Sequence, residues 1–204
     1  MMSKDITKQL FAATKVRELT DIVNDLNDDE AIVWRPVGGN DNNLATINLG
    51  SDPAAGVIER ITNALDSVTE LEWMEKGQPP NITSPRMAAE KWFGIENGRM
   101  AGLTASDVRK LEKLSTRVEV TLQDSDREDK PTIDIRDTGI GLLSEEFGDS
   151  ILSLNKNRKL RKLFLAGAFG QGGSTALAYS PYTVICSRKA KTPGVGADRK
   201  LSHL

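Results

Sequence analysis

The spacing of apolar and polar residues divides the chain into distinct elements from its first thirty residues onward. Apolar side chains recur every three or four positions over residues 4–26, which predicts an amphipathic helix. Two short strands are predicted next, over 31–37 and 44–49, because a turn rich in Gly, Asn and Asp separates them. We expect residues 1–30 to form an N-terminal helical arm that either packs against its own domain or is exchanged across a dimer.

A second helix is marked more strongly than any other element in the sequence. Ser51 and Asp52 are candidate N-caps, and Pro53 suits the first helical position. Apolar residues recur at helical spacing as far as Leu71, and a Gly-Gln-Pro-Pro stretch that starts at Gly77 ends the run. We therefore predict a long helix that begins at Pro53 and ends before Gly77.

The rest of the chain combines helical stretches with alternating strands. Residues 78–116 are predicted to be a helical insertion, with amphipathic stretches at 85–93 and 104–115. Strands are predicted at 118–122 and 132–135. Three shorter elements are expected after them: a helix near 144–154, a helix at 176–179 and a strand at 182–187. This order of elements predicts an α+β fold, with helices on one face of a mixed sheet.

Composition narrows the chemistry that the chain can perform. Its 204 residues are 38% hydrophobic, which suffices for the core of one domain. The 27 Lys and Arg residues balance 29 Asp and Glu residues, so the net charge of -2 does not indicate nucleic acid or a membrane surface as a partner. The only cysteine and the only histidine are Cys186 and His203, which argues against a disulfide framework, a histidine-bound metal and a Ser-His-Asp triad. No apolar run is long enough to span a membrane, and we expect a cytoplasmic protein.

Three polar or glycine-rich motifs carry the candidate chemistry, and the first lies on the long helix. Glu59, Asn63 and Asp66 are spaced so that their side chains share one helical face. Such an oxygen-rich row suits Mg²⁺, which prefers oxygen ligands and keeps several waters. An ordinary polar face in contact with solvent would give the same spacing.

The second motif follows the strand predicted at 132–135. Asp137 is followed by Gly139 and Gly141, so a carboxylate at a strand end precedes two residues that allow close approach to a flat ligand. The carboxylate can accept a hydrogen bond from an exocyclic amine such as that of adenine. An ordinary turn between a strand and a helix would have the same sequence pattern.

The third motif is the glycine-rich run Gly167-Ala-Phe-Gly-Gln-Gly-Gly-Ser174, which precedes a predicted helix. Backbone N–H groups before a helix N-terminus present an anion site. A pattern of this kind also arises by chance, and it matches neither the Walker motif nor the dinucleotide-binding motif of a βαβ unit.

Taken together, the three motifs resemble those of the GHKL superfamily, the ATPases with a Bergerat fold that include gyrase B, the ninety-kilodalton heat-shock chaperones, MutL proteins and histidine-kinase catalytic domains. Their order and spacing resemble the N box, the D-x-G-x-G box and the glycine box over residues 50–187. The resemblance implies a two-layer sandwich over 31–188, with the ATP pocket between the helices that flank the sheet and a mobile lid. The insertion 78–116 matches no part of that pattern, and the tail 189–204 would be truncated or lead to a further domain.

The resemblance also implies a role for each motif residue. Glu59 would be the general base that activates water against the γ-phosphate, and Asn63 would ligate Mg²⁺. Asp66 would support the nucleotide or an ordered water. Asp137 would bind the adenine amine and so select ATP over GTP. Gly139 and its neighbour Gly141 would let the backbone pass close to the base.

The lid would span residues 142–170, with Gly167 at its hinge. Five basic residues lie in this part of the chain, and the resemblance lets Lys156, together with Asn155, reach the phosphates, although a solvated basic lid has the same sequence. The phosphates would be wrapped by the rest of the glycine box, namely Gly170, Gln171, Gly172, Gly173 and Ser174.

The function expected from this resemblance is ATP binding and Mg²⁺-dependent ATP hydrolysis, with lid closure and an ATP-dependent homodimer driving a larger protein. The chain would then be a fragment or an incomplete module that needs a downstream domain or a protein partner. Two alternatives remain: a regulatory or interaction module that binds ATP with little turnover, and a protein serine kinase of the anti-sigma type.

Overall fold

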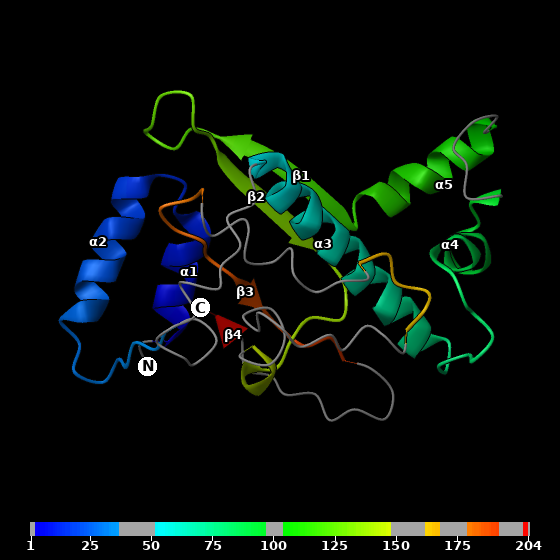
Figure 1. Ribbon diagram of the computed structural model, residues 1–204, viewed down its shortest axis with the longest axis horizontal. Coiled ribbons are helices and arrows are strands. Elements are labelled where there is room, and N and C mark those ends of the chain that lie inside the picture. Colours follow the sequence, from blue (N-terminus) through cyan, green and yellow to red (C-terminus); the bar gives the residue numbers. More distant parts are fainter. Residues whose placement is uncertain are drawn as a thin grey trace.

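The computed structural model describes residues 3–36, 52–96, 104–147, 162–167, 179–191 and 202–203, and this part of the chain has an α+β fold (Figure 1). The helices are α1 (Ser3–Ala12), α2 (Val16–Asn27), α3 (Pro53–Glu75), α4 (Pro85–Phe93) and α5 (Ala105–Ser115), with a short 3-10 helix at Ser144–Glu146. The strands are β1 (Val118–Gln123), β2 (Thr132–Asp137), β3 (Cys186–Ser187) and β4 (Ser202–His203). No helix among these residues is long and apolar enough to cross a membrane.

Helix α3 lies at the centre of the described structure. Its N-terminus is as predicted: Pro53 is the first helical residue, and the Asp52 carboxylate accepts a hydrogen bond from Ala54 N at 2.9 Å. The helix ends at Glu75, directly before Lys76 and Gly77, where the chain turns with a positive φ of 77°. Figure 1 shows α3 crossing the hairpin of β1 and β2, and it contacts both strands.

The β1–β2 hairpin is antiparallel and confirms the two strands predicted before and after residues 124–131. Its register places Val120 opposite Ile135 and Leu122 opposite Ile133, so apolar residues share one face of the pair. The described strands form two antiparallel pairs, β1 with β2 and β3 with β4, and parallel pairing does not occur among them.

The two helices of the insertion also form where the sequence predicts them. Ser84 caps α4 through its side chain, and Gly94 ends the helix in the left-handed conformation with φ of 67°. Thr104 and Asp107 form a capping box at the start of α5. Hydrogen bonds from Thr104 also lower the pKa of the Asp107 carboxyl.

The N-terminal region differs from the prediction, because two helices replace the single helix expected over 4–26. The chain leaves helical geometry between α1 and α2, where the Glu18 carboxylate accepts hydrogen bonds from the backbone N–H groups of Thr14 and Lys15. These bonds lower the pKa of Glu18. Val16 N, the first donor of α2, bonds to the carbonyl of Ser125 in the hairpin loop at 3.1 Å. A contact with a distant loop thus accompanies the break.

Helix α2 and the turn before it are hydrogen-bonded to distant parts of the chain. Thr132 Oγ1 donates to the carbonyl of Thr14, and the hydroxyls of Thr20 and Tyr182 are 3.0 Å apart. The N-terminal arm is therefore bonded to both the hairpin and the segment before β3.

Several other predicted elements differ or lie outside the described residues. Residues 31–36 form no strand, and of the strand predicted at 182–187 only Cys186–Ser187 is observed, with no pairing of the preceding residues to another strand of the described part of the chain. The helix near 144–154 begins as the short 3-10 helix, and its continuation lies outside the described residues. The strand at 44–49 and most of the helix at 176–179 lie outside them as well.

Candidate functional site

The three residues of the first motif lie on one face of α3, as their spacing requires. Asn63 Nδ2 donates to Glu59 Oε1 at 3.4 Å, and both side chains are half-buried. Asp66 lies about 10 Å from Glu59 along the helix axis and is only 4% exposed. The row therefore runs from the half-buried carboxylate of Glu59 to the buried carboxylate of Asp66.

The buried carboxylate of Asp66 binds the beginning of the third motif. One of its oxygens accepts a hydrogen bond from Ala166 N at 2.7 Å and the other accepts one from Gly167 N at 3.0 Å. Hydrogen bonds to an ionised acceptor are among the stronger ones in proteins. Asp66 thus positions the backbone at the first glycine of the glycine-rich run.

The second motif is bound to the next residue of the same helix. Ile140 N donates to the carbonyl oxygen of Ser67 at 3.0 Å. A Cβ atom at Gly139 would lie 2.3 Å from the Ser67 carbonyl carbon and 2.5 Å from Val68 N, so only glycine lets the loop approach the helix this closely. Asp66 and Ser67 are consecutive residues of α3. They therefore bind Ala166 and Ile140, which are 26 positions apart in the sequence.

The loop after β2 is also shaped by contacts within the chain. Asp137 is exposed, and its Oδ1 accepts a hydrogen bond from Gly139 N at 2.8 Å, which makes a local turn. Gly141 has φ of 60°, and a Cβ atom there would lie 2.1 Å from the Arg188 carbonyl oxygen. The sequence interpretation assigned both glycines to close approach of an adenine ring, whereas the structure explains each by a close contact with the chain itself.

The structure therefore brings together part of the predicted site. Asp66, Gly139 and Gly167 meet around one turn of α3, while Glu59 and Asn63 lie one to two turns toward its N-terminus. The remaining predicted residues lie outside the described part of the chain: Asn155, Lys156, Gly170, Gln171, Gly172, Gly173 and Ser174.

Two residues that the sequence interpretation did not single out continue the same face of α3. Glu70 forms an ion pair with Lys162, a basic residue of the predicted lid, and Trp73 packs against Phe164 with ring centroids 5.3 Å apart. Their positions follow Asp66 at spacings of four and seven, which is the continuation of the motif row. The periodicity of the helix could have identified both.

The guanidinium of Arg60 lies next to the carboxylate of Glu59 in the polar row on α3. Burial lowers the pKa of the Arg60 guanidinium, and the negative charge of Glu59 opposes that effect. Arginine remains protonated at neutral pH even so. The half-buried carboxylate of Glu59 thus lies beside a fixed positive charge.

Among the described residues, no group of three or more acidic, histidine or cysteine side chains could hold a metal ion. The donors that could contribute to a magnesium site are the Glu59 carboxylate and the Asn63 amide oxygen, one helical turn apart. Two such protein ligands suit Mg²⁺, which retains water in the rest of its octahedral shell.

Comparison with models of protein families, with curated proteins and with solved structures finds no significant match to this chain.

Proposed function

We propose that the chain is an ATP-binding module of the GHKL type that hydrolyses ATP with the help of Mg²⁺. The observation that carries the proposal is the meeting of the three motifs on α3. The Asp66 carboxylate binds the start of the glycine-rich run, and the adjacent Ser67 carbonyl binds the loop of the second motif through Ile140 N. A nucleotide site made from these motifs requires that they lie side by side.

The proposed fold is the Bergerat sandwich, and the packing of α3 against the β1–β2 hairpin supports it. In this proposal the nucleotide lies beside the N-terminal half of α3. Its base faces Asp137 at the end of β2, and its phosphates face the glycine-rich run that starts at Gly167. Residues 142–170 would form the lid, whose C-terminal part, residues 162–167, is attached to α3.

Glu59 is the proposed general base. Its carboxylate accepts a long hydrogen bond of 3.4 Å from the Asn63 amide. A carboxylate at this position can orient a water molecule and accept its proton as the water attacks the γ-phosphate. Asn63 and Glu59 have the oxygen donors that would hold Mg²⁺, which when bound neutralises phosphate charge.

Asp137 is the proposed selectivity group for adenine. One of its oxygens is bonded to Gly139 N, and its side chain is exposed at the end of β2. An ionised carboxylate accepts hydrogen bonds only, so it favours the amine of adenine over the carbonyl at the same position of guanine. We therefore propose selectivity for ATP over GTP.

Calorimetric titration of the chain with ATP and Mg²⁺ tests binding. We expect Asp137→Asn to abolish binding, because the amide presents a donor where only an acceptor is wanted. Asp134→Asn, three residues earlier on β2, is the matched control: it loses only a surface ion pair with Arg136 and should retain binding. Equal affinities in wild type and Asp137→Asn would exclude the adenine-binding role.

Steady-state phosphate release by the full-length protein tests hydrolysis. We expect Glu59→Ala to lower the rate by about 100-fold or more, the usual contribution of a general base. Glu75→Ala, at the exposed end of α3, should leave the rate unchanged. Binding without release in the wild type would favour the regulatory module, and transfer of labelled phosphate to a protein would favour the serine kinase.

We further propose that ATP turnover in this module drives a larger protein through lid closure and dimerisation. Sedimentation of the full-length protein with and without a non-hydrolysable ATP analogue tests this step. A dimer that forms only with the analogue is expected, whereas an unchanged mass would exclude ATP-dependent dimerisation.

A further inference from the structure

Residues 162–167, which precede the glycine-rich run, are held along one face of α3. Asp66 binds the amides of Ala166 and Gly167, and Glu70 pairs with Lys162 one turn further along the helix. Trp73 follows at the next position of the same face and packs against Phe164. The segment is therefore attached at three successive levels of the helix.

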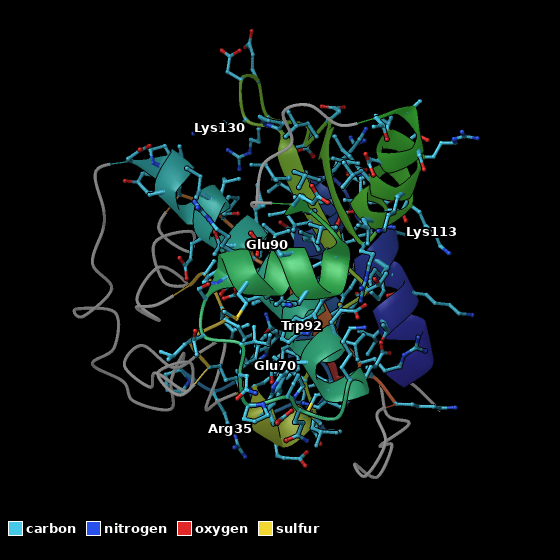
Figure 2. All side chains as sticks on the ribbon, turned by 90° about the vertical axis from the view of Figure 1, so that its right-hand side faces the viewer. Arg35, Glu70, Glu90, Trp92, Lys113 and Lys130 are labelled. Carbon is cyan, nitrogen blue, oxygen red and sulfur yellow. The ribbon has the colours of Figure 1, made fainter. Side chains whose placement is uncertain are left out.

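The helical insertion, residues 78–116, packs against residues 162–167 from the side opposite α3. Trp92 of α4 packs edge-on against Phe164, with ring centroids 5.3 Å apart and an interplanar angle of 74°. Phe164 is only 4% exposed between the two tryptophans, which we call the aromatic clamp (Trp73, Trp92 and Phe164). Figure 2 views the molecule with α4 toward the viewer and labels Trp92 of the clamp and Glu70.

The insertion also fixes the tryptophan of α3. Trp73 Nε1 donates to the carbonyl of Pro79 at 3.2 Å, and Ile82 packs against the same cluster. Ala88 of α4 is 1% exposed and belongs to the buried cluster that includes Phe164 and Leu165. The contacts of the insertion thus converge on the segment that leads into the glycine-rich run.

We infer that the helical insertion positions the start of the glycine-rich run through the aromatic clamp. Displacement of Phe164 would move Ala166 and Gly167, two and three residues further on, away from the Asp66 carboxylate. The consequence for ATP rests on the proposed function, because Gly167 begins the run that would bind the phosphates. Trp92 is then a positioning residue for the phosphate end of the site, supplied by a part of the chain that the GHKL resemblance does not cover.

Hydrogen exchange of the intact chain tests the positioning without nucleotide. We expect Trp92→Leu to accelerate exchange of the Ala166 and Gly167 amides by about tenfold, since an aromatic contact is worth about that factor in an equilibrium. Trp92→Phe, which keeps a ring in the clamp, should have a smaller effect. The matched control is Phe93→Leu: Phe93 adjoins Trp92 on α4 but faces the guanidinium of Arg117. Equal acceleration in Trp92→Leu and Phe93→Leu would overturn the inference.

Calorimetric titration with ATP and with adenosine tests the consequence for the site. We expect Trp92→Leu to weaken ATP binding by about five- to tenfold while leaving the affinity for adenosine unchanged, because only ATP carries phosphates. Equal weakening of both ligands would overturn the link to the phosphate end. If the wild type binds neither ligand, the proposed function fails, and the exchange measurement still decides whether the insertion positions Gly167.

Discussion

The two halves of α3 follow one helical pattern, yet they lie in different surroundings. Ile58 in the N-terminal half is 62% exposed and Leu65, just after the midpoint, is 50% exposed, although both fit the apolar spacing of the sequence. In the C-terminal half, Asp66 is buried although it is an acidic residue, and Leu71 is 8% exposed. Position in the tertiary structure, and not residue type, decides which side chains of this helix are covered.

The C-terminal half of α3 anchors distant segments of the chain, whereas the N-terminal half carries the candidate catalytic residues Glu59 and Asn63. The C-terminal half binds two segments that are distant in the sequence, the loop at residues 139–140 and residues 162–167, so its side chains are held in fixed positions. The proposed base, Glu59, lies in the more open half, about two turns from the Asp66 anchor. A reactive group on a rigid helix is positioned by contacts made elsewhere on that helix.

The largest effect is expected from Asp66→Ala. The change leaves the amides of Ala166 and Gly167 without their acceptor, and we expect the free energy of unfolding to fall by about 4 kcal/mol, at about 2 for each amide. Asp66→Asn should lose less, because the amide oxygen still accepts one of the two bonds. Urea unfolding followed by circular dichroism measures both. A loss below about 1 kcal/mol in Asp66→Ala would show that the anchor does not hold in solution.

Two leucines of α3, Leu65 and Leu71, compare an exposed position with a buried one on the same helix. We expect Leu71→Ala to lower the free energy of unfolding by about 3 kcal/mol, because it leaves a cavity in the covered half. Leu65→Ala should change it by no more than about 0.5 kcal/mol, since the side chain is half exposed. Urea unfolding of the two variants side by side is the measurement. Equal losses would mean that Leu65 is as buried in solution as Leu71.

A smaller effect is expected at the contact between α3 and the loop after β2. Gly139→Ala places a methyl group against Ser67, and we expect a loss of about 2 kcal/mol from overpacking. Gly77→Ala is the control, because that glycine also resists substitution through its positive φ but has no atom within 4 Å of the added Cβ. Only Gly139→Ala should accelerate hydrogen exchange at Ile140 N, the donor to Ser67. Unchanged exchange there would contradict the close contact.

The smallest effect is expected at the N-terminus of α3. Asp52→Ala removes the side-chain cap of Ala54 N, and we expect thermal unfolding to show a loss of about 1 kcal/mol. Asp52→Asn should retain most of the stability, since asparagine caps nearly as well. A loss as large as that of Asp66→Ala would mean that the open half of the helix is as important for folding as the anchored half.

Elements with local start and stop signals were predictable from the sequence. Asp52 and Pro53 mark the start of α3, and Ser84 and Gly94 mark both ends of α4. The hairpin strands follow from alternation of apolar and polar residues. The break between α1 and α2 was not predictable, because the apolar pattern continues through it and one contact at the break involves Ser125, more than a hundred residues away.

The candidate site likewise combines features that the sequence predicted with features that it could not predict. The spacing of Glu59, Asn63 and Asp66 places them on one face by helical geometry alone, and the contact between the first two was foreseeable. The partners of Asp66 and the reason for Gly139 were not foreseeable. Both depend on which segment lies against α3, and no local pattern specifies that.

The sequence by itself therefore determined the helices of the described region from α3 to α5, the hairpin, and the row of polar side chains on α3. The tertiary structure alone decided that Asp66 is buried, that Leu65 is exposed, and that the insertion contacts the segment before Gly167. The physical reason is that capping and periodicity act over a few neighbouring residues, whereas burial and long-range hydrogen bonds depend on how distant segments pack together.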